Sequence, residues 1–204
     1  MVKPLAPGVA LWRDYFSRPL QRELVETVLR LALEAPFYRP RMPKSEKPFS
    51  VEETNFGRLG WISDKDGYRY TAQHPLSGQP WPAIPEPLMA LWQEVAGYPH
   101  PPECCLVNLY RAGAKMGAHQ DRDEEELAAP VVSVSLGDDA QFRFGGLARK
   151  GPTQSVKLSS GDELMFGGPA RRMFHGIDRV LYGSSQIVPG GGRMNLTLRR
   201  VNPA

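Results

Sequence analysis

The sequence has 204 residues, of which 41% are hydrophobic and 23% are charged, with a formal net charge of +3. These values are typical of one globular domain that is large enough to bury a core. The apolar runs are too short for a membrane span, and the first residues lack a secretory signal. The adjacent cysteines Cys104 and Cys105 favour a reducing compartment. We therefore expect a cytoplasmic protein with no membrane partner.

Two helices are predicted in the first half of the chain. Ser17 is a candidate N-cap of the first, and apolar residues recur at helical spacing from there to Ala35. The second is predicted from Glu86 to about Ala96, where Gly97 ends it. Between them, the run from Gly60 to Tyr70 is typical of two short strands around a turn.

From Glu103 onward the pattern indicates short β-strands separated by Gly, Asp, Pro or Ser. The expected strands are Cys104–Tyr110, Val131–Leu136, Ala140–Phe144, Gln154–Leu158, Glu163–Phe166, Gln186–Val188 and Met194–Val201. Many short strands with such turn residues predict a sandwich or barrel, jelly rolls included. We expect one mainly β domain of the α+β class over residues 1–204, with helices in an N-terminal extension.

His119 and Asp121 are separated by one residue. On an extended strand this spacing places both side chains on one side, where they can bind the same metal ion. A third ligand is needed, and among the four histidines His175 is the natural candidate. Two histidines and a carboxylate form the facial triad of non-haem Fe(II) oxygenases. Alternatively, each histidine is structural and the acidic run 121–126 is a solvated loop, which is the interpretation we prefer for residues 124–126.

Near the C-terminus, alternation predicts that Arg193, Asn195, Thr197 and Arg199 share one face of a strand. Two arginines that face the interior would each need an anion, and a small dicarboxylate could bind both. The alternative is an edge strand with both arginines in solvent, and periodicity alone does not decide. Two further polar residues, spaced two apart on another strand, suit the same ligand: Asn108 and Tyr110.

Several runs together resemble the AlkB family of Fe(II)- and 2-oxoglutarate-dependent dioxygenases. They are Leu59-Gly-Trp-Ile-Ser, Gly67-Tyr-Arg-Tyr70, Gly78-Gln-Pro-Trp-Pro82, Asn108-Leu-Tyr110, Gly113–Asp123, Ala129–Gly137, Phe144-Gly-Gly-Leu147 and Arg193–Arg199, and they follow the family's order from about Asn55 to Arg199. The family's fold is a double-stranded β-helix, or jelly roll. The resemblance implies a nucleotide-recognition lid within residues 1–100 and a catalytic core over 101–204. Leu109 stands where an arginine is familiar, and Met194 replaces an aromatic residue.

The resemblance also implies roles for individual residues. The catalytic iron would be bound by His119, Asp121 and His175. The distal carboxylate of 2-oxoglutarate would meet Arg193, Tyr110 and Asn195, and the metal-chelating end would meet Asn108 and Arg199. Substrate contacts are implied for Trp61, Tyr68, Tyr70, Asp123 and Arg149. In particular, Trp61 would stack on the flipped base opposite His119, and Asp123 would contact its exocyclic amino group.

The reaction implied is oxidative demethylation of N1-methyladenine and N3-methylcytosine in single- or double-stranded DNA, or in RNA, with O2 as the oxidant. Formaldehyde, succinate and CO2 are released. These bases are cationic and cannot pair normally, so their extrusion costs less than that of a sound base, and an aromatic face and a carboxylate both attract them. Without the resemblance, Trp61 would be interpreted as a core residue and Asp123 as a solvated acid. The alternatives are an oxygenase of the same fold that acts on a protein or small molecule, and a non-catalytic jelly roll that binds nucleic acid. We expect a monomer.

Overall fold

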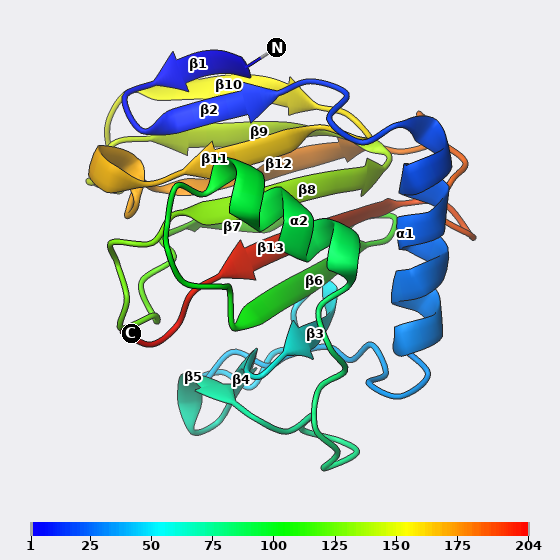
Figure 1. The fold of residues 1–204 in the computed structure, drawn as a ribbon. Helices are drawn as coiled ribbons and strands as arrows, with labels where there is room; N and C mark the ends of the chain where they lie inside the picture. Colours follow the sequence, from blue (N-terminus) through cyan, green and yellow to red (C-terminus); the bar gives the residue numbers. More distant parts are fainter. Residues whose placement is uncertain (1, 204) are drawn as a thin grey trace.

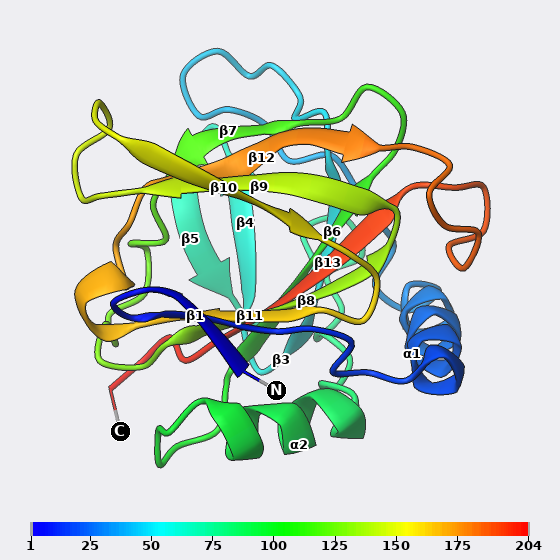
Figure 2. The same ribbon diagram turned by 90° about the horizontal axis from the view of Figure 1, so that it is seen from above.

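Two antiparallel sheets face each other in the computed structural model, which describes residues 2–203 (Figures 1 and 2). The larger sheet has the strand order β1 (Val2–Ala6), β2 (Val9–Trp12), β11 (Glu163–Phe166), β8 (Val131–Gly137), β13 (Arg193–Arg199), β6 (Cys104–Tyr110) and β3 (Glu52–Gly57). The smaller sheet has the order β10 (Thr153–Leu158), β9 (Asp139–Gly145), β12 (His175–Leu181) and β7 (Met116–His119). This arrangement is the predicted jelly roll.

The two helices, α1 (Arg18–Leu31) and α2 (Glu86–Val95), pack on the outer face of the larger sheet (Figure 2). Apolar side chains of both helices meet the outward-facing residues of β6, among them Val107 and Leu109. The alternate residues of β6, such as Asn108, face the opposite sheet. Because both faces are covered, every residue of β6 is buried. Within residues 2–203, neither helix is long and apolar enough to cross a membrane.

A separate two-stranded hairpin, β4 (Gly60–Asp64) and β5 (Gly67–Thr71), lies beyond the β3 edge of the larger sheet (Figure 1). We refer to residues 60–71 as the lid hairpin. A Cβ atom on Gly60 would lie 2.3 Å from the indole ring of Trp81, so only glycine fits there. This contact fixes the start of the lid hairpin against the Pro80-Trp81-Pro82 segment.

Most of the strands predicted from the sequence are confirmed within one or two residues, as are α2 and the lid hairpin. The first helix ends at Leu31 rather than Ala35, and the Ser17 side chain forms no cap hydrogen bond. The predicted strand Gln186–Val188 is wrong. It lies in an irregular connection that continues into three glycines with positive φ, and Val188 is buried without pairing in a sheet.

Five observed strands, β1, β2, β3, β7 and β12, have no counterpart among the predicted strand ranges. β1 contains a proline at a sheet edge, and β12 carries the exposed pair Asp178–Arg179, so neither shows a clear alternating pattern. The strands β1, β2 and β3 precede residue 100 and yet belong to the larger sheet. The segment 1–100 is therefore joined to the β core by backbone hydrogen bonds as well as by helix packing.

Candidate active site

The candidate metal ligands come from two neighbouring strands of the smaller sheet. His119 is the last residue of β7, His175 is the first of β12, and the two are direct partners in the antiparallel register. Asp121 lies in the loop just after β7, and not on an extended strand as expected. A Cβ atom on Gly176 would lie 2.7 Å from the Met116 carbonyl oxygen, so this glycine permits the close approach of β7 and β12.

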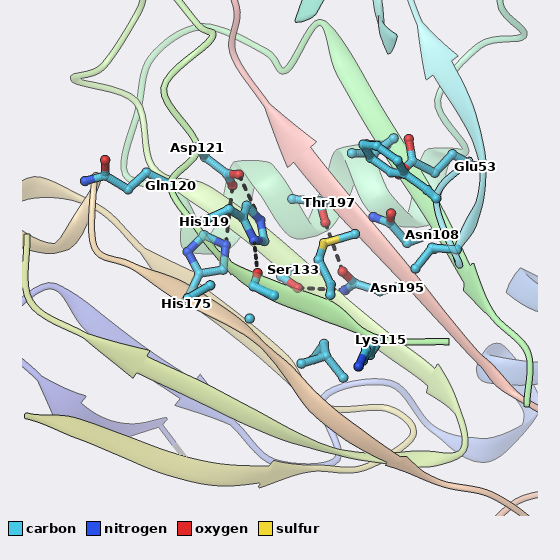
Figure 3. A pocket seen from close by; sticks show the side chains of 18 of the residues that line it. Glu53, Asn108, Lys115, His119, Gln120, Asp121, Ser133, His175, Asn195 and Thr197 are labelled. Atoms are coloured by element: carbon cyan, nitrogen blue, oxygen red, sulfur yellow. Dashed lines mark hydrogen bonds and ion pairs between the residues drawn. The ribbon is translucent and has the colours of Figure 1, made fainter. Parts of the chain in front are cut away.

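The three side chains converge at one end of a cavity between the sheets (Figure 3). Nε2 of His119 lies 3.7 Å from Oδ1 of Asp121, and Nε2 of His175 lies 3.9 Å from Oδ2. One candidate ligand atom from each residue can be chosen so that all three lie within 4.8 Å of one another. This geometry fits a single ion bound by two imidazoles and one carboxylate.

Hydrogen bonds and charge set the protonation that a metal requires. Nδ1 of His119 lies 2.9 Å from the Gly117 carbonyl oxygen, and Nδ1 of His175 lies 3.1 Å from that of Met173. A carbonyl only accepts, so both Nδ1 atoms carry hydrogen and both Nε2 lone pairs face Asp121.

Burial, and next the charge of His119, lower the pKa of His175 to about 4. Burial alone would raise the pKa of Asp121, but Arg199 and the two histidines hold it below its ordinary value. The site therefore offers a neutral imidazole at His175 and an ionised carboxylate at Asp121, the forms that bind metals.

The cavity has a volume of about 590 Å³. It is lined by all of the site residues predicted from the sequence except Tyr70, namely Trp61, Tyr68, Asn108, Tyr110, His119, Asp121, Asp123, Arg149, His175, Arg193, Asn195 and Arg199. This volume is in the range of sites that bind small molecules, and polar groups are concentrated on the wall formed by the larger sheet. Residues from both halves of the chain thus meet in one space.

The register of the larger sheet arranges these polar groups in rows. Arg193 on β13 pairs with Tyr110 on β6, and in the next inward-facing row Asn195 pairs with Asn108. Glu53 on β3 extends the second row beyond Asn108 (Figure 3). Sequence reasoning did not identify Glu53, because the strand β3 that turns it inward was not predicted.

Arg193 is 1% exposed, on a strand with neighbours on both sides, so the edge-strand alternative is wrong. Its Nη2 donates to Oγ of Ser135 at 2.9 Å, and its guanidinium lies 5.4 Å from the centre of the Tyr110 ring. Its Nε and Nη1 have no hydrogen-bond partner within residues 2–203. A buried guanidinium with two unused donors beside a cavity fits a carboxylate ligand.

Arg199 is also buried inside the cavity wall. Its Nη2 donates to Oδ2 of Asp121 at 3.0 Å, and its Nη1 lies 3.4 Å from Oε1 of Glu124. The interpretation of Glu124 as a solvated acid is wrong, because this residue is 4% exposed and also binds Arg171. Two buried guanidinium groups require carboxylate partners, which explains its position. Glu125 is exposed, as expected.

Two aromatic residues of the lid hairpin, Trp61 and Tyr68, line the cavity. Trp61 stacks on Tyr68 with ring centres 5.6 Å apart and planes 16° apart. Its Nε1 donates to Oδ2 of Asp123 at 2.8 Å. Tyr70 lies on the same hairpin, but its hydroxyl group donates to Glu124 at 2.5 Å. The structure therefore gives Tyr70 a different set of contacts from those of Trp61 and Tyr68.

Three basic side chains also line the cavity: Arg149, which the resemblance had indicated, and Lys115 and Arg122, which sequence reasoning had not identified. Arg122 and Arg149 are exposed. Positive charge at the mouth of a cavity favours an anionic substrate such as a phosphate backbone. Arg122 could have been identified from the sequence as a residue near the site, because it lies between the predicted site residues Asp121 and Asp123.

Comparison with known proteins gives concordant results. Residues 8–199 match the model of the 2OG-Fe(II) oxygenase superfamily. The chain is 53% identical to an "Alpha-ketoglutarate-dependent dioxygenase AlkB homolog" of Caulobacter vibrioides, over 100% of this chain and 93% of that protein. It is 39% identical to "Alpha-ketoglutarate-dependent dioxygenase AlkB" of Escherichia coli, over 97% and 92%. Its fold is similar to the solved structure of OsALKBH1, with a TM-score of 0.83, 28% identity, and coverage of 98% and 100%.

Proposed function

Because this chain belongs to the AlkB family within the 2OG-Fe(II) oxygenase superfamily, we propose that it demethylates N1-methyladenine and N3-methylcytosine in DNA or RNA. The reaction is a direct reversal of alkylation damage. The observation that supports it most strongly is the convergence of His119, Asp121 and His175 on one point of a cavity. The same cavity is lined by the buried Arg193, whose Nε and Nη1 have no hydrogen-bond partner within residues 2–203.

The residues present suit both an Fe(II) ion and 2-oxoglutarate. His119, Asp121 and His175 hold the ion through the two Nε2 atoms and the carboxylate. Arg193 binds the distal carboxylate of the cosubstrate, beside Tyr110 and Asn195. The other end lies near Asn108 and Arg199, whose Nε has no partner within residues 2–203. When bound, iron, 2-oxoglutarate and O2 supply the power to oxidise a methyl group, with succinate, CO2 and formaldehyde as products.

The chain's own residues select the substrate. A base methylated at N1 of adenine or N3 of cytosine is positively charged, so it is attracted to the ring of Trp61 and to the carboxylate of Asp123. Both groups line the cavity that contains the metal ligands. Arg149, Lys115 and Arg122 bind the phosphates of the strand that carries the base. Tyr68 supports Trp61 by stacking on it.

The test is a reconstitution without oxygen. Purified protein is loaded with Fe(II) and 2-oxoglutarate, air is admitted, and an oligonucleotide with one N3-methylcytosine is followed by mass spectrometry. We expect loss of the methyl group, dependent on both iron and 2-oxoglutarate and abolished in His119→Ala. If the oligonucleotide is unchanged while succinate forms steadily, the protein is an oxygenase but N3-methylcytosine is not its substrate.

Two further properties belong to this proposal. We infer that residues 1–204 act as a single dioxygenase domain and as a monomer, because one cavity is lined by every predicted site residue except Tyr70. A cytoplasmic location remains a prediction from the sequence. Sedimentation of the wild-type protein at several concentrations tests the monomer, since a mass that rises with concentration would contradict it.

A further inference from the structure

The carboxylate and the backbone of Asp121 are held by two different arginines. On the side-chain end, Nη2 of Arg199 donates to Oδ2 at 3.0 Å. On the backbone end, Nη1 of Arg171 donates to the carbonyl oxygen of Asp121 at 2.8 Å. Arg171 is 3% exposed, and its Nε also donates to the Ala129 carbonyl oxygen at 2.9 Å. Because Asp121 lies in a loop, these contacts replace the restraint that a strand would provide.

Glu124 joins the two arginines. Its Oε2 accepts a hydrogen bond from Nη2 of Arg171 at 3.1 Å, and its Oε1 lies 3.4 Å from Nη1 of Arg199. Asp121, Arg171, Glu124 and Arg199 therefore form a closed ring of contacts with two positive and two negative side chains. We call these four residues the Asp121 ring. A buried, charge-balanced and bonded ring is a rigid support.

Tyr70 connects the Asp121 ring to the lid hairpin. Its hydroxyl group donates to Oε1 of Glu124 at 2.5 Å and accepts from Nη1 of Arg199 at 3.3 Å. Tyr70 lies on β5, directly opposite Trp61 on β4. Trp61, which lines the cavity, is therefore the cross-strand partner of Tyr70, which contacts two members of the Asp121 ring.

We propose that Tyr70, Glu124 and Arg171 are positioning residues that hold Asp121 for the metal and couple the lid hairpin to the metal centre. Metal binding fixes Asp121, and Asp121 fixes Arg199 and Arg171. The two arginines fix Glu124, and Glu124 and Arg199 fix the Tyr70 hydroxyl group. By reciprocity, an ordered lid hairpin strengthens metal binding. The inference rests on the metal site of the proposed function but is independent of which base is the substrate.

Metal affinity tests the positioning role without substrate or turnover. Tyr70→Phe removes only the hydroxyl group, and we expect its dissociation constant for Mn(II) to rise about tenfold, as found for groups that orient metal ligands. Tyr15→Phe is the matched control, since the Tyr15 hydroxyl group also donates to a glutamate, Glu94, but on the helix side of the larger sheet. Its Mn(II) affinity should equal that of the wild type.

Glu124→Gln and Arg171→Lys should weaken Mn(II) binding in the same way. Glu125→Gln and Arg172→Lys, at exposed neighbouring positions, are the controls and should leave Mn(II) affinity unchanged. Unchanged Mn(II) affinity in a folded Tyr70→Phe would overturn the inference while the proposed function stands. A wild type that binds no Mn(II) would instead overturn the metal site, and with it the proposed function.

Hydrogen exchange tests the coupling to the lid hairpin. In the wild type, Mn(II) should slow amide exchange over residues 60–71, and in Tyr70→Phe this response should be lost although the metal is saturating. In Tyr15→Phe the response should remain. Equal slowing in the wild type and in Tyr70→Phe would overturn the coupling, because a purely structural tyrosine would alter exchange with and without metal alike.

Discussion

The indole Nε1 of Trp61 donates a hydrogen bond to Oδ2 of Asp123 at 2.8 Å. Trp61 belongs to the lid hairpin and Asp123 to the loop that carries Asp121, so this bond closes the lid hairpin on the metal side of the cavity. These are the two residues proposed to attract a cationic base. Each is held in place by the other, which prepares an aromatic face and a negative charge side by side.

The charge of Asp123 should determine the preference for cationic bases. Asp123→Asn keeps an acceptor for Trp61 but removes the negative charge. We expect kcat/KM to fall about tenfold, or about 1.4 kcal/mol, for cationic N3-methylcytosine, and to change little for neutral N3-methylthymine. The measurement is steady-state kinetics on two oligonucleotides that differ only in the methylated base. An equal loss on both would show that Asp123 acts through geometry rather than charge.

Arg193 should determine the affinity for 2-oxoglutarate. Arg193→Met keeps the volume but removes both unused donors and the charge, so the dissociation constant should rise at least 30-fold, or by roughly 2 kcal/mol. The dissociation constant of Arg193→Lys should lie between those of the wild type and Arg193→Met. A lysine keeps the charge, but it cannot bind a carboxylate through two parallel bonds.

Calorimetric titration of the Mn(II)-loaded protein measures the effect of both substitutions. Arg143→Met, which removes an exposed arginine paired with Asp178, serves as the control. Normal affinity in Arg193→Met would contradict the proposed cosubstrate site.

Glu53 should make the binding of 2-oxoglutarate sensitive to pH. Burial raises the pKa of Glu53 to about 8, and Arg199 only partly opposes this. The carboxyl group is therefore neutral below pH 8 and becomes negative above it, next to the row that contains Asn108 and Asn195. A dianionic ligand prefers the neutral form, so affinity should be full below pH 8 and fall about tenfold as the pH rises above it.

Titration with 2-oxoglutarate between pH 6.5 and 9.5 tests this, at constant ionic strength and with Mn(II) saturating. Glu53→Gln should bind with the same affinity throughout, since its amide does not ionise. A wild-type affinity that is constant with pH, or an equal fall in Glu53→Gln, would contradict the assignment.

Glu163 should make the fold less stable at high pH. It is the first residue of β11, fully buried, and neither of its oxygens has a hydrogen-bond partner within residues 2–203. Burial, with a contribution from Glu94, raises its pKa to about 9. The folded state therefore retains a proton that the unfolded chain releases above its ordinary pKa. The unfolding free energy should fall by up to about 1.4 kcal/mol per pH unit as the pH rises from the ordinary pKa of a glutamate towards 9.

Urea unfolding at pH 6 and pH 8.5 measures this slope. Glu163→Gln should remove about half of it, because Glu53, whose pKa burial raises to about 8, contributes a similar slope up to that pH. Glu125→Gln, at an exposed position, should leave the slope unchanged. A slope in Glu163→Gln equal to that of the wild type would contradict the assignment to Glu163.

The three candidate metal ligands that the structure brings together could be identified from the sequence, because histidine is rare in this chain. Only four histidines are present, and His119 is spaced from Asp121 as ligands often are. Arg193 and Arg199 were identified as a pair, but periodicity could not place them inside or outside. Both arginines are buried because β13 lies between β8 and β6 in the larger sheet. The order of strands in a sheet depends on distant parts of the chain, so a local sequence pattern does not predict it.

Other features depend on tertiary contacts that local patterns do not contain. Glu124 resembles its solvated neighbour Glu125 in sequence, and it is distinguished by its buried contacts with Arg171, Arg199 and Tyr70. Tyr70 and Tyr68 lie on one hairpin, yet one donates to Glu124 and the other stacks on Trp61. Glu53 is turned into the cavity by a strand whose residues do not alternate clearly between polar and apolar.

We propose that this protein couples the oxidation of 2-oxoglutarate to the removal of a methyl group from a damaged base. The most direct test is to measure succinate, formaldehyde and repaired base in one reaction on an N3-methylcytosine oligonucleotide. We predict equal amounts of all three with the wild type, and none with His119→Ala. Succinate that forms at the same rate with methylated and unmethylated oligonucleotides, without formaldehyde, would contradict the account.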